Sequence, residues 1–346
     1  MMEYLDIIHD NCENHSPIKW WPKFAYHYTD VSNAVSVLSS GFLYSRIKSE
    51  KMNLMKNNNA SRQVIDMTKT SAVANVRFYF RPLTPTQYHN EGYKHSSLRY
   101  WSDKDANVPV PVFLVFDLEK LLKMPETRFS ETAQSGYGDR LLSGIEEFSK
   151  LNFDKIYSNG YSNDADIKKY RHAELLYPNA FDIDKDNCLR AVLCRNDSEK
   201  TTLLNLLRDS NIRNFYKYQS MIKVFKEDVF ENNALFITEC RYYDGNVSVS
   251  FSDTYSKEKY KDKQMIKNGV DELTPVDSKI EFEWENAKGL IHHLEMGFKL
   301  NYSKSKSITF CNLPVFKEAR NIKIRIYFED KLMCYMNQSI AEIELI

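Results

Sequence analysis

The sequence predicts an α+β protein in which a block of mixed helices and strands, residues 1–232, precedes an all-β region, residues 233–346. In the first block, β-branched and aromatic segments alternate with segments whose apolar residues recur at helical spacing. In the second, about seven short strand patterns are separated by turn signals such as Asp244-Gly245-Asn246, which is typical of a β-sandwich. The length of 346 residues also exceeds the ~100–200 residues usual for one domain, so two domains are expected.

The composition and the hydrophobic pattern indicate in which compartment the protein is expected. Its 47 basic and 47 acidic side chains balance, so no overall field attracts nucleic acid or anionic membranes, although neutral enzymes do act on nucleic acid. No apolar run approaches membrane-spanning length, and residues 1–14 lack the pattern of a signal peptide. The 6 cysteines form no C-x-x-C pair, as expected for thiols in a reducing compartment. A cytoplasmic protein without membrane contact is therefore expected.

The sequence of the first block predicts one strand that is followed directly by a helix. His27 and Thr29 lie in a strand pattern, and Asp30 after them is a suitable N-cap. Apolar residues then recur at helical spacing, and Gly41 follows where a C-terminal glycine belongs. The His27 segment is therefore expected to be a strand that leads directly into a helix.

Other elements follow from the same patterns. Further strands are expected in the first block at 76–80, 110–116, 173–177 and 189–194, and helices at 139–151 and 198–208, the last with Ser198 as its cap. Strands are expected in the all-β region at 235–243, 247–251, 280–284, 292–300, 308–311, 322–328 and 332–336. The charged stretch 257–267 is expected to be a solvated loop. Its Lys/Tyr-rich part, 257–263, could contact phosphates and stack bases, but the interleaved acids favour the solvated loop.

Three segments far apart in the chain carry residues suited to breaking the bond between nicotinamide and ribose in NAD. They are Tyr26-His27-Tyr28-Thr29, Val76-Arg77-Phe78-Tyr79-Phe80-Arg81-Pro82 and Arg171-His172-Ala173-Glu174-Leu175-Leu176-Tyr177-Pro178. That reaction builds positive charge on the ribose carbon, as glycoside cleavage does. A carboxylate can hold a ribose hydroxyl, stabilise the charge and deprotonate the acceptor, and an arginine can hold NAD through paired hydrogen bonds.

On these residues the first block resembles the DarT family, bacterial toxins that ADP-ribosylate bases in single-stranded DNA. Members open with a strand-borne histidine-x-threonine before a helix that ends in glycine, here His27, Thr29 and Gly41. An arginine, here Arg62, precedes an aromatic V-P-F-Y-F-N-P-R-S-P wall. The closing R-x-A-E-x-L-x-P of the family is present around Glu174.

The resemblance covers about residues 24–230 and implies the fold and the roles of the site residues. The expected fold is an ADP-ribosyltransferase-like split β-sheet core with helices. Glu174 is expected as the catalytic carboxylate and Arg62 as the arginine that polarises NAD. The expected contacts to NAD are made by His27, Thr29, Arg62, Phe78, Tyr79 and Phe80. No metal site is expected, because His292-His293 with Glu295 lacks the H-E-x-x-H spacing.

The aromatic wall departs from the family pattern in its polar positions. Arg81, Leu83 and Thr84 replace an asparagine, an arginine and a serine, so the polar groups facing the substrate are expected to differ. One face of the strand must pack inward, so part of the wall is expected in the core, with Tyr79 on the face of Arg77.

The resemblance implies an NAD-dependent mono-ADP-ribosyltransferase toxin with NAD as co-substrate. Its acceptor is expected to be a base in single-stranded DNA, with RNA as the alternative, and loop aromatics such as Tyr137, Tyr157 or Tyr161 are expected to stack it. By analogy such a toxin has a cognate antitoxin protein and serves in a toxin–antitoxin or phage-defence system. The competing hypothesis makes the all-β region the working part, as a module that binds an antitoxin, a chaperone or a phage component.

Overall fold

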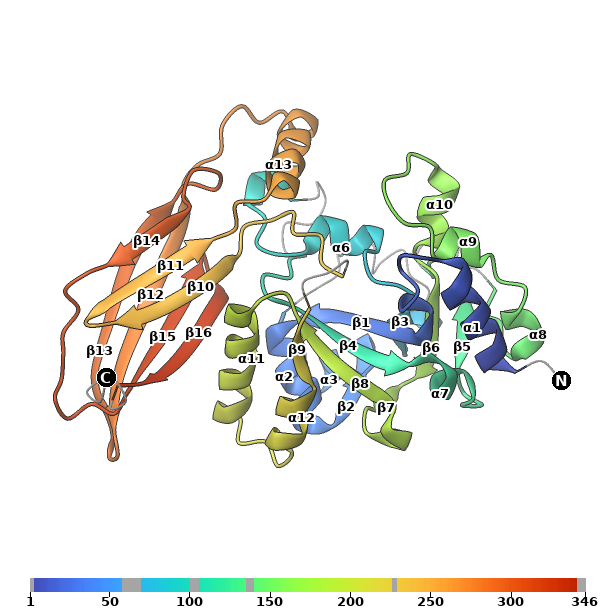
Figure 1. Ribbon diagram of the computed structural model, residues 1–346, viewed down its shortest axis with the longest axis horizontal. Helices are drawn as coiled ribbons and strands as arrows, with labels where there is room; N and C mark the ends of the chain where they lie inside the picture. The colour runs from blue at the N-terminus through green and yellow to red at the C-terminus, as the bar shows by residue number, and fades with distance from the viewer. Residues whose placement is uncertain (1–2, 58–69, 100–105, 135–139, 226–228, 341–346) are drawn as a thin grey trace.

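The computed structural model describes residues 3–57, 70–99, 106–134, 140–225 and 229–340. In Figure 1 the first block and the all-β region lie next to each other, with the N-terminus at the far end of the first block. None of the helices in these ranges combines the length and the apolar character that a membrane span requires.

The first block is built around one β-sheet. Its strands are β1 (Phe24–Asp30), β3 (Asn75–Tyr79), β4 (Pro111–Asp117), β5 (Arg128–Ser130), β6 (Glu174–Pro178), β8 (Leu189–Cys194) and β9 (Ile222–Val224). Over the described residues the sheet has seven strands in the order β5-β6-β3-β1-β4-β8-β9, antiparallel throughout except for the pair β8 and β9. Two short strands, β2 (Phe42–Tyr44) and β7 (Ala180–Asp182), pair with each other outside it.

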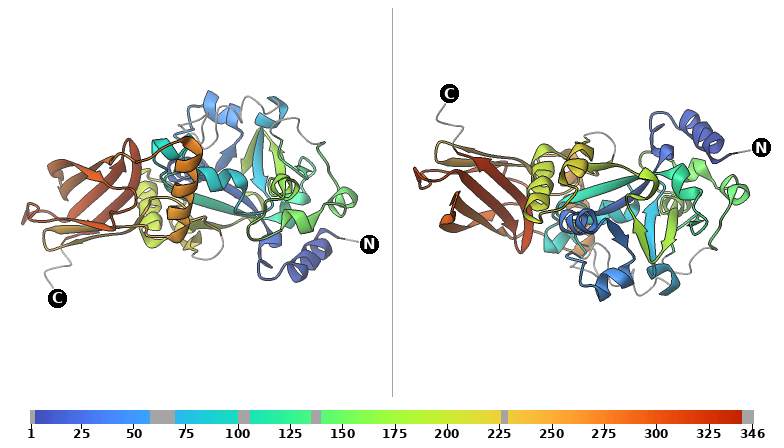
Figure 2. Two further views of the ribbon diagram at one scale, coloured as in Figure 1. Left: turned by 90° about the horizontal axis from the view of Figure 1, so that it is seen from above. Right: turned by 90° about the horizontal axis from the view of Figure 1, so that it is seen from below.

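Short helices connect these strands. They are α1 (Tyr4–Asn14), α2 (Val31–Ser40), α3 (Arg46–Lys51), α5 (Thr70–Val73), α6 (Pro85–Asn90), α7 (Leu118–Leu122), α8 (Ile145–Phe148), α9 (Phe153–Ile156), α10 (Ala165–Tyr170), α11 (Asp197–Asp209) and α12 (Phe215–Met221). Figure 2 shows the same ribbon from above and from below and places α1 at the outer end of the first block, far from the all-β region.

The predicted step from strand to helix is confirmed at β1 and α2. The Asp30 side chain accepts a hydrogen bond from the backbone N–H of Ser32 at 3.0 Å, which satisfies one of the free donors of the helix start. Gly41 ends α2 with a φ of 75°, in the left-handed region that glycine adopts without steric cost. The local signals at both ends of α2 therefore agree with the structure.

The sheet opens between β1 and β3. β1 pairs with β4 along its length, from Phe24 opposite Asp117 to Asp30 opposite Pro111. Its register with β3 is given by Tyr26 opposite Tyr79. The part of β1 that follows Tyr26 therefore leaves room beside β3, and this gap in the pairing places the site described below.

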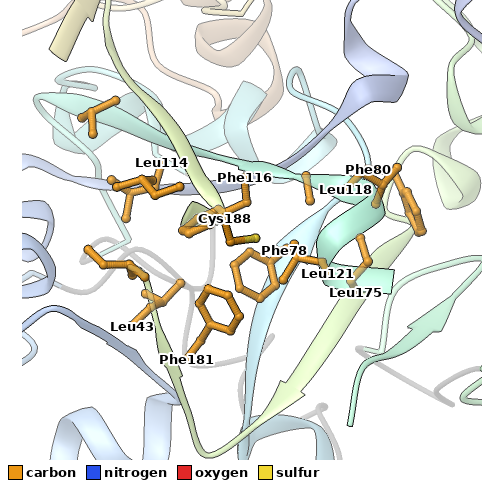
Figure 3. Packing of buried hydrophobic residues seen from close by; sticks show 14 of the residues in the cluster. Leu43, Phe78, Phe80, Leu114, Phe116, Leu118, Leu121, Leu175, Phe181 and Cys188 are labelled. Carbon is orange, nitrogen blue, oxygen red and sulfur yellow. The ribbon is translucent and has the colours of Figure 1, made fainter. Parts of the chain in front are cut away.

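Aromatic side chains fill the core beneath this opening. The ring centroids of Phe78 and Phe116 lie 5.0 Å apart, and those of Phe78 and Phe181 lie 5.4 Å apart, both edge to face. Figure 3 shows these rings meeting beside Leu43 and Cys188. Such geometry is the favoured one for aromatic pairs and fixes the orientation of β3.

All seven strands predicted for the C-terminal region are confirmed. They are β10 (Ile237–Tyr243), β11 (Asn246–Phe251), β12 (Val276–Asn286), β13 (Gly289–Leu300), β14 (Ser307–Phe310), β15 (Asn321–Phe328) and β16 (Lys331–Ser339). Among the described residues they form one sheet in the order β10-β11-β14 and a second in the order β13-β12-β15-β16, and apolar residues of both sheets share one hydrophobic cluster. The α+β class with an all-β C-terminal region is therefore confirmed.

Three predictions of local structure need correction. The stretch expected to be a loop at 257–267 is part of a helix, α13 (Tyr255–Asn268), which buries Lys257, Tyr260 and Gln264 against the molecule. The helix expected at 139–151 is reduced to α8, since Gly144 has a φ of 85° and Leu142 pairs with Phe129. Residue 139 itself lies outside the described ranges. The cap of α11 is Asn196, whose side chain accepts from the backbone N–H of Glu199.

The segment between β3 and β4 connects the first block to the all-β region. Tyr93 and Leu98 are fully buried in the hydrophobic cluster of the all-β region. Tyr93 exchanges backbone hydrogen bonds of 3.0 and 3.1 Å with Leu235. Nearby, the buried Glu91 carboxylate pairs with Arg195 at 3.3 Å and accepts from the backbone N–H of Asn232 at 3.0 Å. Apolar and backbone contacts therefore join this segment to the all-β region, whereas the buried Glu91 pair lies within the first block.

Candidate active site

A cavity of about 210 Å³ lies in the opening between β1 and β3. Backbone and side chains from β1, α2, β2, α3 and β3 line it. The lining combines cations, amides, hydroxyls and aromatic rings, among them His27, Thr29, Asn33, Tyr44, Arg46, Ser49, Asn57, Arg77 and Tyr79. These are the groups that the phosphates, the ribose hydroxyls and the nicotinamide ring of NAD require, so the residues present fit that ligand.

Arg77 and Glu174 form a two-point ion pair at the edge of this cavity. Arg77 Nε donates to Glu174 Oε2 at 2.5 Å, and Nη2 donates to Oε1 at 2.8 Å. The backbone N–H of Gln134 donates to the same Oε1 at 2.7 Å. Because Tyr79 lies opposite Glu174 in the sheet, the side chains of Arg77 and Glu174 leave the sheet on the same face.

Glu174 and Arg77 differ in their exposure to solvent. The Glu174 side chain is 0% exposed and the Arg77 side chain is 26% exposed. Arg77 also lines the cavity, so the guanidinium lies between the carboxylate and the open space. A buried carboxylate that has three donors is held in one orientation, as a catalytic group must be.

His27 is oriented by the backbone of β3. Its Nδ1 lies 3.0 Å from the carbonyl oxygen of Arg77, which can only accept, so Nδ1 carries the proton. Burial lowers the pKa of His27 below its usual value, and the hydrogen bond to Arg77 offsets this only in part. The neutral ring therefore presents an unprotonated Nε2 as an acceptor for a ligand hydroxyl.

The remaining predicted contacts separate onto two faces of the strands. Thr29 is buried and lines the cavity, as does Tyr79, whose pKa is raised by burial. Phe78 and Phe80 point the other way, into the hydrophobic core, where they are 1% and 0% exposed. Of the expected aromatic wall, Tyr79 is therefore the member that borders the cavity.

Arg62 lies outside the described residues. The structure does describe the chain on both sides of its segment, and both sides line the cavity, through Met55 and Asn57 before it and Val73 after it. Asn33 on α2 fixes the first side, because its Oδ1 accepts from the backbone N–H of Asn57 at 3.1 Å and its Nδ2 donates to the carbonyl of that residue at 2.8 Å.

The expectation that Arg81 faces the substrate needs correction. Arg81 is 1% exposed and donates to the carbonyls of Ile156 and Ser158 at 3.0 and 2.5 Å. Its guanidinium lies 4.8 Å from the ring centre of Trp21, and burial lowers its pKa to about 9. The arginine at this position therefore anchors the loop after α9. Thr84 also has a local role, since its side chain caps α6.

The same loop carries two of the three aromatic residues expected to stack a base. Arg171 holds the loop as well, with Nε donating to Ser158 Oγ at 3.1 Å and Nη2 to the Gly160 carbonyl at 2.7 Å. Tyr157 is 1% exposed and packs in the core, so it cannot stack a base, whereas Tyr161 is 82% exposed. The third, Tyr137, lies outside the described residues.

Sequence reasoning assigned no role to Arg77 or to the backbone N–H of Gln134. Arg77 was visible as a residue that alternates with Tyr79 on a strand, and this spacing places both on one face. The hydrogen bond from the Gln134 backbone could not be predicted from the sequence, because a backbone N–H is present at every non-proline position.

Comparisons with known proteins give one matching family model and several similar solved structures. The model of the family described as the ssDNA thymidine ADP-ribosyltransferase DarT matches residues 26–225. Solved structures similar to the chain include DarT of Thermus sp. 2.9 in complex with ADP-ribosylated ssDNA, with 16% identity, a TM-score of 0.48 and coverage of 59% of this chain and 95% of that one. The complex of the same protein with NAD+ has 17% identity, a TM-score of 0.45 and coverage of 59% and 96%.

A third similar structure is Thermosipho africanus DarTG in complex with ADP-ribose, with 15% identity, a TM-score of 0.43 and coverage of 59% of this chain and 49% of that one. No protein among the curated sequences matches the chain. The family model spans more than half of the 346 residues and includes His27, Arg77 and Glu174. The chain therefore belongs to the DarT family of ssDNA thymidine ADP-ribosyltransferases.

Proposed function

We propose that the cavity beside Arg77 and Glu174 binds NAD and that the protein transfers ADP-ribose from it to a thymidine base in single-stranded DNA. Membership of the DarT family supports the reaction and its acceptor. The single observation that carries the site is the buried carboxylate of Glu174, held by Arg77 at the edge of a cavity lined with groups suited to NAD.

His27 and Tyr79 position the nicotinamide ribose in this proposal. The unprotonated Nε2 of His27 accepts a hydrogen bond from a ribose hydroxyl, and Tyr79 borders the ring of the leaving group. Arg77 lies close enough to Glu174 to hold it before the substrates bind, and its partial exposure allows the guanidinium to turn toward an anionic phosphate. Arg62 stays a proposed contact to NAD through the family resemblance alone.

Glu174 acts as the general base once the acceptor is in place. It takes the proton from the ring nitrogen of the base while that nitrogen forms a bond to the anomeric carbon of the ribose. The bond between this carbon and nicotinamide breaks, and nicotinamide leaves as a neutral molecule with the electron pair. The carboxylate also stabilises the positive charge that the ribose carbon carries in between.

The substitution Glu174→Gln tests this role. We expect transfer to a thymidine-containing oligonucleotide to fall by at least about a thousandfold, because an amide cannot accept the proton. The Gln oxygen can still accept from Gln134 and from one Arg77 nitrogen, so the fold and the binding of NAD are expected to remain. Mass spectrometry of the oligonucleotide measures the transfer, and calorimetric titration measures NAD binding.

Glu119→Gln is the matched control, because Glu119 makes a partly exposed i,i+4 pair with Lys123 and its loss changes the charge equally. Transfer by Glu174→Gln at the wild-type rate would exclude Glu174 as the base. Transfer by the wild type to RNA but not to DNA would redirect the proposal to RNA.

We also infer a biological setting from the family. The protein acts in the cytoplasm as a toxin and is restrained by a cognate antitoxin. Expression of the wild type in a bacterial host without the antitoxin is expected to stop growth, and expression of Glu174→Gln is not. Equal toxicity of the two would separate toxicity from the transfer reaction.

A further inference from the structure

Helix α13 buries one of its lysines against the molecule and exposes others to solvent. Lys257, Tyr260 and Gln264 are buried against the molecule, whereas Lys259 and Lys263 are exposed. Residues four apart lie above one another on a helix, so Tyr255, Lys259 and Lys263 form one stripe. This α13 stripe carries two positive charges and an aromatic ring.

The acids of α13 are occupied by other lysines. Glu258 pairs with Lys261 at 2.6 Å and lies 3.6 Å from Lys257. Asp262 pairs with Lys261 at 3.2 Å. Within the described part of the chain, neither Lys259 nor Lys263 makes an ion pair with an acid. The acids that suggested a neutral solvated surface therefore do not neutralise the α13 stripe.

Aromatic rings accompany these two lysines. Lys259 Nζ lies 5.9 Å from the ring centre of Tyr161 and 6.0 Å from that of Tyr255. Tyr161 and Tyr255 are 82% and 80% exposed. Lys263 Nζ lies 5.7 Å from the ring centre of Tyr88 on α6. The stripe of the all-β region thus meets the loop before α10 and helix α6, both of which belong to the first block.

The α13 stripe leads toward the catalytic pair. In Figure 1, α6 lies between α13 and α10, and β6 with Glu174 begins shortly after α10. His89 on α6 marks the same path, because its pKa is lowered to about 4 by burial and then by Lys94, Lys267, Lys263 and His172. Burial and the nearby Arg77 likewise lower the pKa of His172 to about 4. His89 and His172, both neutral near pH 7, therefore lie between Lys263 and Arg77.

We propose that the α13 stripe and Tyr161 bind the part of the single-stranded DNA that continues from the acceptor base. Lys259 and Lys263 contact its phosphates, and a base outside the active site stacks on Tyr161. Exposed aromatic rings next to lysines are the combination that binds single strands without reading their sequence. The inference rests on the proposed function for its ligand. Helix α13 lies beyond the matched residues 26–225, so this contact belongs to the added all-β region.

The double variant Lys259→Ala/Lys263→Ala tests the phosphate contacts. We expect its Kd for a labelled single-stranded DNA of about 20 nucleotides to rise about tenfold, measured by fluorescence anisotropy without NAD, and to rise less for about 4 nucleotides. The slope of log K against log salt is expected to become shallower by about 1.4, since two phosphate contacts are lost at about 0.7 each.

Lys288→Ala/Lys317→Ala is the matched control. Both lysines are exposed, and Lys288 lies in the turn between β12 and β13, at the opposite end of the strands from α13. This control is expected to keep the wild-type Kd and slope. An unchanged Kd and slope in the α13 double variant, or an equal loss in the control, would overturn the proposal.

Tyr161→Ala and Tyr161→Phe test the stacking. The alanine variant is expected to bind about tenfold more weakly and the phenylalanine variant like the wild type, because stacking needs the ring and not the hydroxyl. Double-stranded DNA that competes as well as single-stranded DNA would contradict stacking on an unpaired base. Because these assays need no NAD, a wild type that binds DNA through α13 but transfers nothing would refute the proposed function and leave this inference standing.

Discussion

At the scale of single residues, position in the sheet decides which members of a motif are available to a ligand. Arg77 and Tyr79 alternate with Phe78 on β3, so two of them border the cavity and the third fills the core. His27 compensates for the opening of the sheet, because its Nδ1 donates to a β3 carbonyl where β1 no longer pairs. The same contact fixes the ring so that Nε2 is the free acceptor.

The substitutions His27→Asn and His27→Phe separate the two roles of this residue. Asparagine keeps a donor near the position of Nδ1 but removes Nε2, whereas phenylalanine removes both. We expect both variants to raise the KM for NAD about tenfold, and only His27→Phe to lose about 1–3 kcal/mol of unfolding free energy through the unpaired Arg77 carbonyl. Steady-state kinetics and thermal unfolding measure the two effects. A KM at the wild-type value in both variants would exclude His27 from the NAD site.

At the scale of elements, buried polar groups fix the loops around the site. Arg81 and Arg171 hold the loop after α9 through its carbonyls and the Ser158 hydroxyl. This leaves Tyr161 exposed at its tip. Helix α6 packs against α13 through Tyr88 and Tyr260, whose ring centroids lie 5.2 Å apart. Helices from both regions are therefore packed against each other at this contact.

The burial of His89, on the helix α6 that packs against α13, makes the stability of the protein depend on pH. Its pKa is about 4 in the folded protein and about 6.5 in an unfolded chain, so the unfolded chain binds more protons between these values. Stability therefore falls as the pH falls from about 6.5 to 4. In His89→Gln the loss of unfolding free energy between pH 7 and 4.5 is expected to be smaller than in the wild type by about 1–3 kcal/mol.

Denaturant unfolding at a series of pH values measures this difference. His9→Gln serves as the control, since His9 is exposed on α1, and we expect it to follow the wild-type curve. A His89→Gln curve parallel to that of the wild type would mean that His89 is solvated and not held between α6 and α13.

At the scale of the whole molecule, the two regions share a junction. Tyr93 from the first block is 0% exposed within the cluster of the all-β region, and its ring lies 5.4 Å from that of Phe328. Two amides of the first block also donate to carbonyls of the all-β region, Asn196 Nδ2 to Ile237 at 3.1 Å and Asn205 Nδ2 to Tyr335 at 3.0 Å. We propose two units, 1–232 and 233–346, that are stable only together.

The substitution Tyr93→Ala tests this joint stability. It is expected to cost about 3–5 kcal/mol, as removal of a large buried ring does, and to lower the temperature of one common unfolding transition in calorimetry. Tyr243→Ala, at a site that is 72% exposed, is the control and is expected to leave the transition in place.

The shortened chain 1–232 is expected to lose activity and cooperative unfolding, because Tyr93 and Leu98 lose their cover. A fragment 1–232 that unfolds cooperatively and transfers ADP-ribose at the full rate would contradict joint stability. It would favour the hypothesis that the all-β region is a separate binding module.

Patterns in the amino-acid sequence were enough to identify the family and most of the local units. Strand alternation placed all seven C-terminal strands, and Asp30 and Gly41 set the ends of α2, because these signals act within a few residues. Which polar groups meet became visible in the folded structure. It paired Glu174 with Arg77, 97 residues away, and turned Arg81 from the substrate to the loop after α9. The helix at 255–268 likewise depends on tertiary contacts, because its buried face packs against a segment 171 residues away, at His89. Such contacts depend on burial between distant segments, which no local pattern records.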